Sequence, residues 1–527
     1  MTSVTCISFF LLGSLLAIEP RHGEAADLLA SSSQWTPKHA GHLLRRAGFG
    51  GTPEQIQYLK KLGREKAVEY LVHYESIEGG IEPLELDPYE PRRPFGARGK
   101  NKADRQKQVA QNRREDRLLL EDVLGWWLEA MVMSPRPLEE KLTLFWHGHF
   151  TSGYREVKSS HAMLKQNRTL RRHASGNFRQ MLLDVTHDPA MILYLNMQQN
   201  RKDKPNENYA RELLELFTLG PGHYTEKDIK EAARAFTGIA VDQQTGEHVF
   251  RWRQHDDGEK SFLGRTGDLE AADIIDAILE QPAASRFIAR KAWCYFAYPD
   301  PEEDVVEALA RVLRENNHEF KPMLTAMFMS DAFYSPRAMF TQIKSPTQLM
   351  VGTMRALEIA PHDAAALNIG LRMMGQSLMQ PPNVKGWDGG AAWITASTLY
   401  NRYNVMGALI AGNDNVQSRR RRQRVIAAMR QSLGQEAPVD EAALSRLQPP
   451  FDPLPAVEKR RLTTAEKLVD HYAEVLLQRP LKPEKRKLLI ETMKPHYDRT
   501  NPKSGHNMDV IRGLIHLIVS MPEYQLS

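Results

Sequence analysis

The chain has 527 residues, of which 42% are hydrophobic and 26% are charged, and its formal net charge is +5. These values are ordinary for a soluble globular protein, with several domains or with one large helical domain that carries insertions. So small a charge for this length does not by itself indicate a nucleic-acid-binding protein. The two cysteines, Cys6 and Cys294, are too few for a cysteine-rich zinc or iron–sulfur site, so such sites are excluded.

The N-terminus has the pattern of a secretory signal peptide. Residues 4–18 are an apolar run, and the small residues Gly23 and Ala25 follow at the positions that a signal peptidase reads. The run is too short for a comfortable membrane span, which favours a signal peptide. No Lys or Arg precedes the run, although signal peptides usually begin with a positively charged segment. We expect a signal peptide at residues 1–25 and a periplasmic or extracellular location. No later stretch of the sequence resembles a transmembrane span.

Helix signals dominate the rest of the chain. N-cap residues followed by proline occur at Thr36, Asp188 and Ser345, Thr52 opens a capping box, and Thr225 starts a helix that ends at Gly238. We therefore expect a mostly α protein. The main expected helices lie at about 36–50, 52–74, 115–133, 137–147, 159–174, 176–187, 189–198, 206–219, 268–281, 283–297, 301–316, 320–331, 346–359, 363–377, 391–411, 417–433, 462–478, 482–494 and 507–520.

Composition divides the chain into segments. We expect a helical domain over residues 36–433, a Pro- and Asp-rich linker over 434–461, and a C-terminal helical module over 462–527. Residues 78–114 are rich in Pro, Gly and charge and are expected to form a long exposed insertion within the first domain.

Two local patterns add detail to this helical fold. Short apolar segments on either side of Gly246 predict one β-hairpin near residues 239–253. Residues 288–335 and 468–525 each contain two helices, then a third apolar helix that stops near an aromatic residue. We interpret these segments as two copies of a three-helix packing module, because two copies are too few for a solenoid.

Several common enzyme signatures are absent from the sequence. It contains no Gly-x-x-x-x-Gly-Lys-Ser/Thr phosphate loop, no His-Glu-x-x-His and no Gly-x-Ser-x-Gly. Function therefore has to be argued from less common clusters.

His147 and His149 are the first such cluster, within Phe-Trp-His-Gly-His-Phe. If Gly148 keeps the backbone extended, both imidazoles lie on one side, which is a frequent metal-binding arrangement. On a helix the two rings would diverge. The alternative is a pair of histidines packed on aromatic side chains near a helix C-terminus.

The expected helix 206–219 is the second cluster. Helical spacing places Asn208, Arg211, Glu212 and Glu215 on one face. This face is either solvated, or it contains a Glu207–Arg211 surface ion pair, or it lines a polar cavity. In the last case Glu212 and Glu215 would be metal ligands or acid–base groups, with Arg211 beside them.

A loop after the expected hairpin is the third cluster. His255 and Asp256 lie there with Lys260 nearby, so they form either a base with its orienting carboxylate or an ordinary polar turn. A further glycine-rich loop, residues 381–393, contains Trp387 and Trp393. It is interpreted either as a platform for stacking sugars or as a helix-packing corner.

Seven ordered segments together resemble the bacterial domain-of-unknown-function 1800 family. They are His42–Gly50, Phe145–Phe150, Asn206–Glu212, Tyr224–Gly238, His255–Asp256, Ile343–Pro346 and Lys385–Trp387, and the similarity covers about residues 36 to 525. The resemblance implies a mostly helical, usually exported bacterial protein, often encoded beside a sulfatase-like protein of the domain-of-unknown-function 1501 family. It implies no catalytic residues. Ile239 replaces the tryptophan that commonly follows Phe-Thr-Gly, which is expected to alter packing only.

Three functional hypotheses follow. The first is an exported enzyme acting on an envelope or extracellular polymer, with a divalent metal held by His147, His149, Glu212 and Glu215 and with Arg211, Glu212, His255 and Asp256 as catalytic residues. The second is a non-catalytic partner or scaffold of the sulfatase-like protein, in which the same residues form a buried polar network. The third is binding of a polyanion or polysaccharide through the basic run Arg419–Arg422.

Overall fold

The computed structural model describes residues 34–87, 102–412 and 450–527. Helices make up most of these residues, and two antiparallel hairpins are the only sheets among them. The expectation of a mostly α protein is confirmed. The expected signal peptide at residues 1–25, the expected helix at 417–433 and the basic run Arg419–Arg422 lie outside the described residues.

Several helices in the first half of the chain begin directly after the predicted N-cap residues. Thr36, Thr52, Asp188 and Thr225 each accept a backbone hydrogen bond as N-caps, which satisfies donors that the first helical turn leaves free. The α-helices are α2 (Pro37–Arg46), α3 (Pro53–Leu62), α4 (Arg64–Val72), α5 (Lys102–Met133), α6 (Pro137–His149), α7 (Tyr154–Val157), α8 (Ser160–Arg172), α9 (Phe178–Thr186), α10 (Pro189–Tyr194), α11 (Asn208–Glu212) and α12 (Glu226–Ala235).

Two hairpins interrupt the helices. Strand β1 (Ile239–Val241) pairs with β2 (His248–Phe250), as the sequence predicts. Strand β3 (Lys260–Phe262) pairs with β4 (Arg265–Gly267) across Leu263 and Gly264, which both have positive φ. This second hairpin was not predicted, because its strands, Lys-Ser-Phe and Arg-Thr-Gly, contain a single large apolar residue and therefore show no strand pattern.

The second half of the chain is again helical, and Ser345 caps α17 through a complete capping box. The helices are α13 (Ala271–Leu279), α14 (Pro282–Phe296), α15 (Glu303–Glu315), α16 (Phe320–Met329), α17 (Pro346–Leu357), α18 (Ala364–Met373), α19 (Ala396–Ala411), α22 (Leu454–Arg460), α23 (Ala465–Leu477), α24 (Pro483–Met493) and α25 (Gly505–Val519). Helix α22 lies inside the segment 434–461 that was expected to be a linker.

The two expected copies of a three-helix unit are present in the element order. Helices α14–α16 end in the short 3₁₀ helix η5 (Ala332–Tyr334), and α23–α25 end in η7 (Pro522–Gln525). The segment after η5 pairs with the segment after η7, because Lys344 donates its N–H to Gln525 (2.8 Å) and Ser527 donates to Gln342 (2.9 Å). The two copies are thus joined through the chain segments that follow them.

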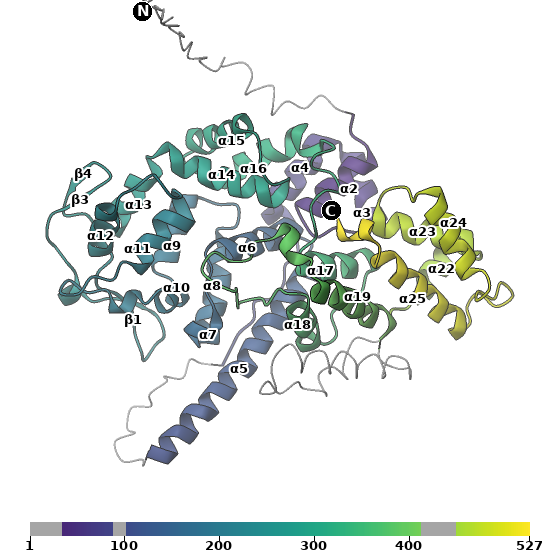
Figure 1. Cartoon of the computed structure of the whole chain (residues 1–527), viewed down its shortest axis with the longest axis horizontal. Coiled ribbons are helices and arrows are strands. Elements are labelled where there is room, and N and C mark those ends of the chain that lie inside the picture. Colours follow the sequence, from purple (N-terminus) through teal and green to yellow (C-terminus); the bar gives the residue numbers. More distant parts are fainter. Residues whose placement is uncertain (1–33, 88–101, 413–449) are drawn as a thin grey trace, which may run out of the picture.

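Hydrophobic side chains form two cores. One lies among α2–α4, α6 and α9–α16 and contains the fully buried Trp146 and Trp293. The other lies among α5, α17–α19 and α22–α25 and contains Trp127. Helices α6 and α8 contribute to both, as Leu142 and Leu144 illustrate. In Figure 1, α22–α25 occupy one end of the molecule and α11–α13 with the hairpins occupy the other, with α6 and α8 between them.

Helix α5 is the longest described element, with 32 residues. It begins at Lys102, inside the segment 78–114 that was expected to form a long exposed insertion. At 1.5 Å per residue it is about 48 Å long, and its N-terminal part projects away from the body (Figure 1). Two side-chain bonds, Gln108 to Asn112 (2.8 Å) and Gln111 to Glu115 (2.9 Å), link successive turns there.

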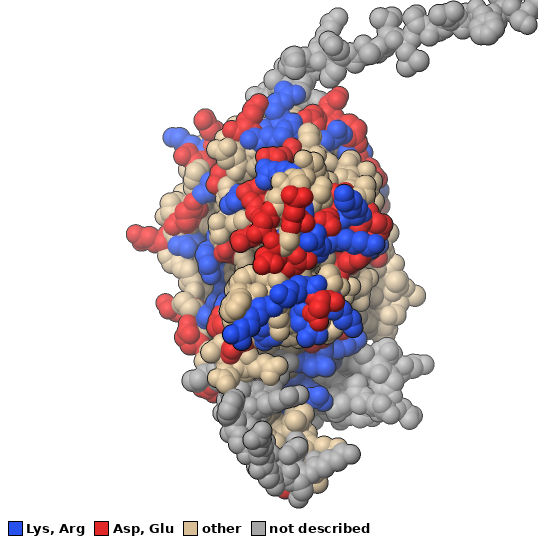
Figure 2. All heavy atoms as spheres, turned by 90° about the vertical axis from the view of Figure 1, so that its left-hand side faces the viewer, with Lys and Arg blue, Asp and Glu red and all other residues tan. Residues whose placement is uncertain are grey.

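The surface at the hairpin end has mixed charge. On this face, which Figure 2 shows, Lys and Arg side chains are interspersed with Asp and Glu side chains. Ion pairs such as Arg179–Asp276 and Arg265–Glu280 account for part of this mixture. Within the described ranges, no helix combines the length and the apolar character that a bilayer span requires.

Candidate functional site

Helix α6 continues through both histidines of the Phe-Trp-His-Gly-His-Phe motif. Phe150 donates its N–H to Trp146 (2.7 Å), so Gly148 does not interrupt the helix. Residues two apart on a helix point about 200° apart, and the two imidazoles therefore diverge. The prediction of an extended His-x-His segment is wrong, because the helical hydrogen bonds persist to the end of the motif.

His147 anchors the loop that follows α18. Its Nε2 accepts the backbone N–H of Met379 at 3.0 Å, and its ring contacts Trp127 and Trp387. Burial lowers the pKa of His147 to about 4, so the ring is neutral at pH 7. Because Nε2 is an acceptor here, the proton of the neutral ring lies on Nδ1.

His149 faces a different part of the molecule and has the opposite tautomer. Its Nε2 lies 3.0 Å from the backbone oxygen of Phe217, so this nitrogen is the donor. The ammonium group of Lys291 lies 3.3 Å from Nδ1 and donates to it, and Lys291 also donates to the oxygen of Leu216 (3.1 Å). Burial, followed by Lys291, lowers the pKa of His149 well below its usual value.

The element that His149 contacts is a π-helix, η3 (Leu213–Thr218), which continues α11. Leu219 donates its N–H to Leu214 (3.0 Å), and the Thr218 hydroxyl donates to Leu213 (2.5 Å), in both cases five residues back. The carbonyl groups of its last turn have no partner further along the helix. His149 and Lys291 supply donors to two of them. This pairing explains why α6 and α14 place a histidine and a lysine at this point.

Glu212 and Glu215 lie at the junction of α11 and η3, and both side chains are partly exposed. Burial raises the pKa of Glu212, and the negative charge of Glu215 raises it further, while Arg211 and Lys385 act in the opposite direction. Tyr224 lies beside Glu215, and Tyr194 lies within the electrostatic reach of Glu212. We refer to Glu212, Glu215, Tyr194, Tyr224 and Lys385 as the carboxylate face.

The loop that holds Lys385 is packed against the C-terminal end of α6. Gly386 has φ +82°, and a Cβ atom at this position would lie 2.5 Å from the oxygen of Gly148. The Thr151 hydroxyl donates to the oxygen of Val384. The lack of a side chain at Gly386 therefore allows the two backbones to approach closely. The segments around His147, Glu212 and Lys385, far apart in sequence, thus meet in one region.

Arg211 takes part in surface ion pairs. It pairs with Glu226 (2.9 Å) and with Glu207 (3.2 Å), and the second pair is the one that helical spacing allows. Asn208 is exposed, and its N–H donates to the side chain of Asn206 (3.0 Å). Neither side chain reaches a buried cavity, so this end of α11 is a solvated surface.

His255 and Asp256 do not form a base and its orienting carboxylate. Nδ1 of His255 lies 2.8 Å from the oxygen of Thr237, while Asp256 pairs with Arg234 (2.7 Å). The Thr237 hydroxyl accepts the N–H of Asp256 (2.8 Å). These bonds tie the loop after β2 to the end of α12. This arrangement matches the polar-turn alternative.

The four candidate metal ligands are not brought together as one set. The acceptor nitrogens of His147 and His149 already accept hydrogen bonds from Met379 and Lys291. In the part of the chain that the structure describes, no group of three or more His, Cys, Asp or Glu side chains could hold a metal ion. The donor set of the carboxylate face, two glutamates and two tyrosines, does not match the histidine–carboxylate site that the sequence predicted.

Three features of this region were not predicted. Lys291 and Tyr194 reach it from distant helices, and nothing in their local sequence indicates this. The π-helix adds a residue to one turn, and no sequence signature predicted it. Lys385 stands in a recognisable segment, but its proximity to Glu212 could be known only from the fold.

Comparison with known proteins places the chain in a family. A family described as "Protein of unknown function (DUF1800)" matches residues 42–526, nearly the whole chain, so the protein belongs to it. No curated protein matches the sequence, and no solved structure matches it.

Proposed function

We propose that this member of the DUF1800 family is an exported acid–base enzyme that acts on an envelope or extracellular polymer at the carboxylate face. The observation that supports this proposal is the Glu212–Glu215 pair at the start of a π-helix. Perturbed carboxylates and π-helical turns are both enriched at functional sites. Export follows from the N-terminal sequence pattern.

The two carboxylates differ in surroundings, which suits them to different roles. Glu212 has a raised pKa through burial and the charge of Glu215, so it retains a proton to higher pH than a free carboxyl group and serves as the general acid. Glu215, with the Tyr224 hydroxyl beside it, serves as the general base. Pairs of carboxyl groups in unequal environments are the usual catalytic groups for glycoside hydrolysis.

The surroundings of the pair suit a carbohydrate polymer. Tyr194, Tyr224 and Trp387 are partly exposed aromatic side chains that can stack on sugar rings, and Lys385 is an exposed cation that can pair with an acidic group on the polymer. No metal is required by these roles, and the metal hypothesis is not retained.

Matched amide variants test this proposal. Glu212→Gln and Glu215→Gln keep shape and remove the acid–base function, so turnover of cell-envelope polysaccharides should fall at least about 100-fold. Glu207→Gln is the control, because Glu207 lies on the same segment and pairs only with Arg211. Reducing-end release is the assay. Full activity in both amide variants would refute the proposal.

The raised pKa gives a second test that needs no substrate. A carboxyl group whose pKa is higher in the folded state than in the unfolded state stabilises the fold at low pH. This contribution is complete below the unfolded-state pKa and is lost as the pH rises through the folded-state pKa. The urea midpoint of Glu212→Gln should therefore equal that of the wild type near pH 4 and be higher than that of the wild type at pH 7. An equal or lower midpoint at pH 7 would contradict the raised pKa of Glu212 and its assignment as the general acid.

A specific observation favours the scaffold function as the second candidate. His147, His149 and Asp256 all bond within the protein, as a packing network would require. In that case the DUF1800 protein binds a sulfatase-like partner, and size-exclusion chromatography of the two purified proteins would show one complex that is retained when Glu212 is replaced by Gln.

A further inference from the structure

Cationic side chains gather where α2, α17 and the C-terminal three-helix unit meet, away from the carboxylate face. Arg45 is 7% exposed, Arg46 1% and Lys344 8%. Arg402, which donates to the oxygen of Lys344 (2.8 Å), is 1% exposed. Charged groups are costly to bury unless a counter-charge accompanies them, and a guanidinium group cannot lose its proton at physiological pH.

The two arginines of α2 have few hydrogen-bond partners. Nη1 of Arg45 donates to the side chain of Gln478, and Nη1 of Arg46 donates to Gln342 and to the hydroxyl of Ser527 (3.1 Å). Nε and Nη2 of both guanidinium groups are buried without a partner. Each arginine thus has a free two-nitrogen edge, which is the edge that binds a carboxylate in a bidentate manner.

Lys344 adds a third positive charge. Its ammonium nitrogen lies 3.5 Å from the centre of the Tyr524 ring, an electrostatic contact weaker than an ion pair. Burial, and then Arg45, Arg479 and Arg402, lower the pKa of Lys344 well below its usual value. For Arg45 and Arg46 too, the neighbouring charges that act on the pKa are cations. None of the described acidic side chains compensates this group.

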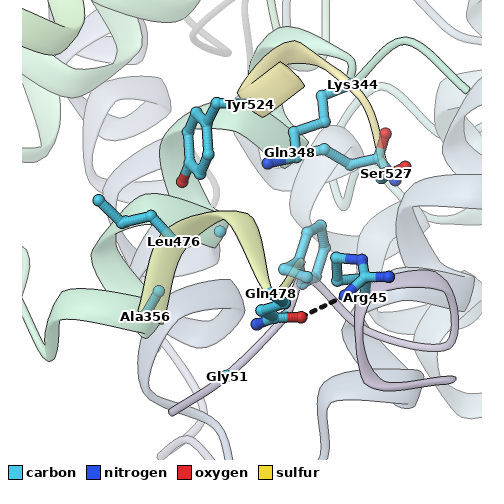
Figure 3. Close-up of a pocket in the computed structure, with 12 residues that line it drawn as sticks. Arg45, Gly51, Lys344, Gln348, Ala356, Leu476, Gln478, Tyr524 and Ser527 are labelled. Atoms are coloured by element: carbon cyan, nitrogen blue, oxygen red, sulfur yellow. Dashed lines mark hydrogen bonds between the residues drawn. The ribbon is translucent and has the colours of Figure 1, made fainter. Parts of the chain in front are cut away.

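A small cavity opens in this cluster. Its volume is about 20 Å³, and Arg45, Lys344, Gln348, Gln478 and Ser527 supply its polar lining. Figure 3 shows Arg45 bonded to Gln478 on one side of the cavity and Lys344, Gln348 and Ser527 on the other. Amide and hydroxyl groups therefore accompany the cations at the cavity wall.

We propose that this cavity binds the carboxylate group of a small organic acid, between the Arg45 guanidinium and the Lys344 ammonium. A carboxylate brings one negative charge and two acceptor oxygens to this cluster, in which Nε and Nη2 of Arg45 have no hydrogen-bond partner. The volume accommodates a water-sized group but not a nucleotide or a phosphorylated sugar. The site is independent of the carboxylate face, and binding there stabilises the junction of α2, α17 and the C-terminal unit.

Formate is the probe for this site. A ligand with three non-hydrogen atoms can reach a dissociation constant of about 1 mM at best. The melting temperature of the protein should therefore rise over 0–50 mM sodium formate at constant ionic strength, with a bulky aromatic sulfonate as the replacing anion. Saturation transfer from the protein to the formate proton should give the same dissociation constant.

Lys344→Met separates a binding role from a structural one. Methionine keeps the length of the side chain and removes the charge, so the variant should be at least as stable as the wild type without formate, and its affinity should be at least 10-fold weaker. Lys165→Met is the matched control, because Lys165 pairs with Glu247 outside the cavity. It should respond to formate as the wild type does.

Two results would overturn the proposal. Equal stabilisation by formate and the sulfonate would mean that ionic strength alone acts. Absence of any response in the wild type would mean that the cavity does not bind a carboxylate group. An unchanged formate response in Lys344→Met would likewise exclude this cavity as the site.

Discussion

His149→Phe tests the role that the structure gives to the second histidine of the His-Gly-His segment. Phenylalanine keeps an aromatic ring among Phe145, Phe150 and Phe217, while it removes the donor that serves the oxygen of Phe217. Leaving one buried carbonyl group without its donor costs about 1–3 kcal/mol. The Lys291 ammonium group also loses its acceptor at Nδ1 but keeps the oxygen of Leu216. We expect the free energy of unfolding to fall by about 2 kcal/mol.

Urea unfolding followed by circular dichroism at pH 7 measures this loss, with His506→Phe as the matched control. His506 also bonds a backbone oxygen through Nε2, at 2.9 Å from His496, but it is exposed, so water replaces the lost bond. Its urea midpoint should stay within error of the wild type. A midpoint of His149→Phe equal to that control would refute the structural role. Loss of a stoichiometric bound metal from the variant, by elemental analysis, would restore the metal hypothesis.

Two further predictions concern backbone contacts. Arg355 donates to the oxygens of Met131 (3.1 Å), Val132 (2.8 Å) and Ser134 (3.1 Å) at the end of α5. Arg355→Met should therefore lower the free energy of unfolding by about 3 kcal/mol in the same urea assay. A loss below about 1 kcal/mol would contradict this prediction. Gly386→Ala should cost about 2 kcal/mol because of the left-handed φ and the clash with the oxygen of residue 148. Its control, Gly513→Ala, meets open space inside α25 and should stabilise by about 0.5–1 kcal/mol.

Local sequence signals predicted helix starts well, because capping is local chemistry. Thr36, Thr52 and Ser345 show this, because each side-chain oxygen accepts the backbone N–H of the residue three positions later. This hydrogen bond depends only on neighbouring residues and not on the rest of the fold. The same local view failed for α5, whose first half is polar on every side and therefore has no amphipathic pattern. Its charge and position beside a Pro- and Gly-rich stretch resembled a loop.

The candidate site was predicted in its residues more than in its geometry. Glu212 and Glu215 were placed on one face by helical spacing, and the structure keeps them adjacent even though the turn becomes π-helical. His147 and His149 were assigned to one site because glycine commonly ends helices, whereas here α6 continues through Gly148, and the residue that permits the close approach of the loop is Gly386. Close approach between segments more than 200 residues apart has no signature in a single sequence.

The projecting part of α5 should behave as a helix–coil system attached to a folded protein. Beyond the body of the molecule its turns are held by backbone bonds and by side-chain pairs such as Gln108–Asn112. Helices with so little tertiary support are marginal in water, and their ends open first. Amide hydrogen exchange should therefore slow progressively from residue 103 toward the buried Trp127. Limited proteolysis should cut this helix while the two cores stay intact.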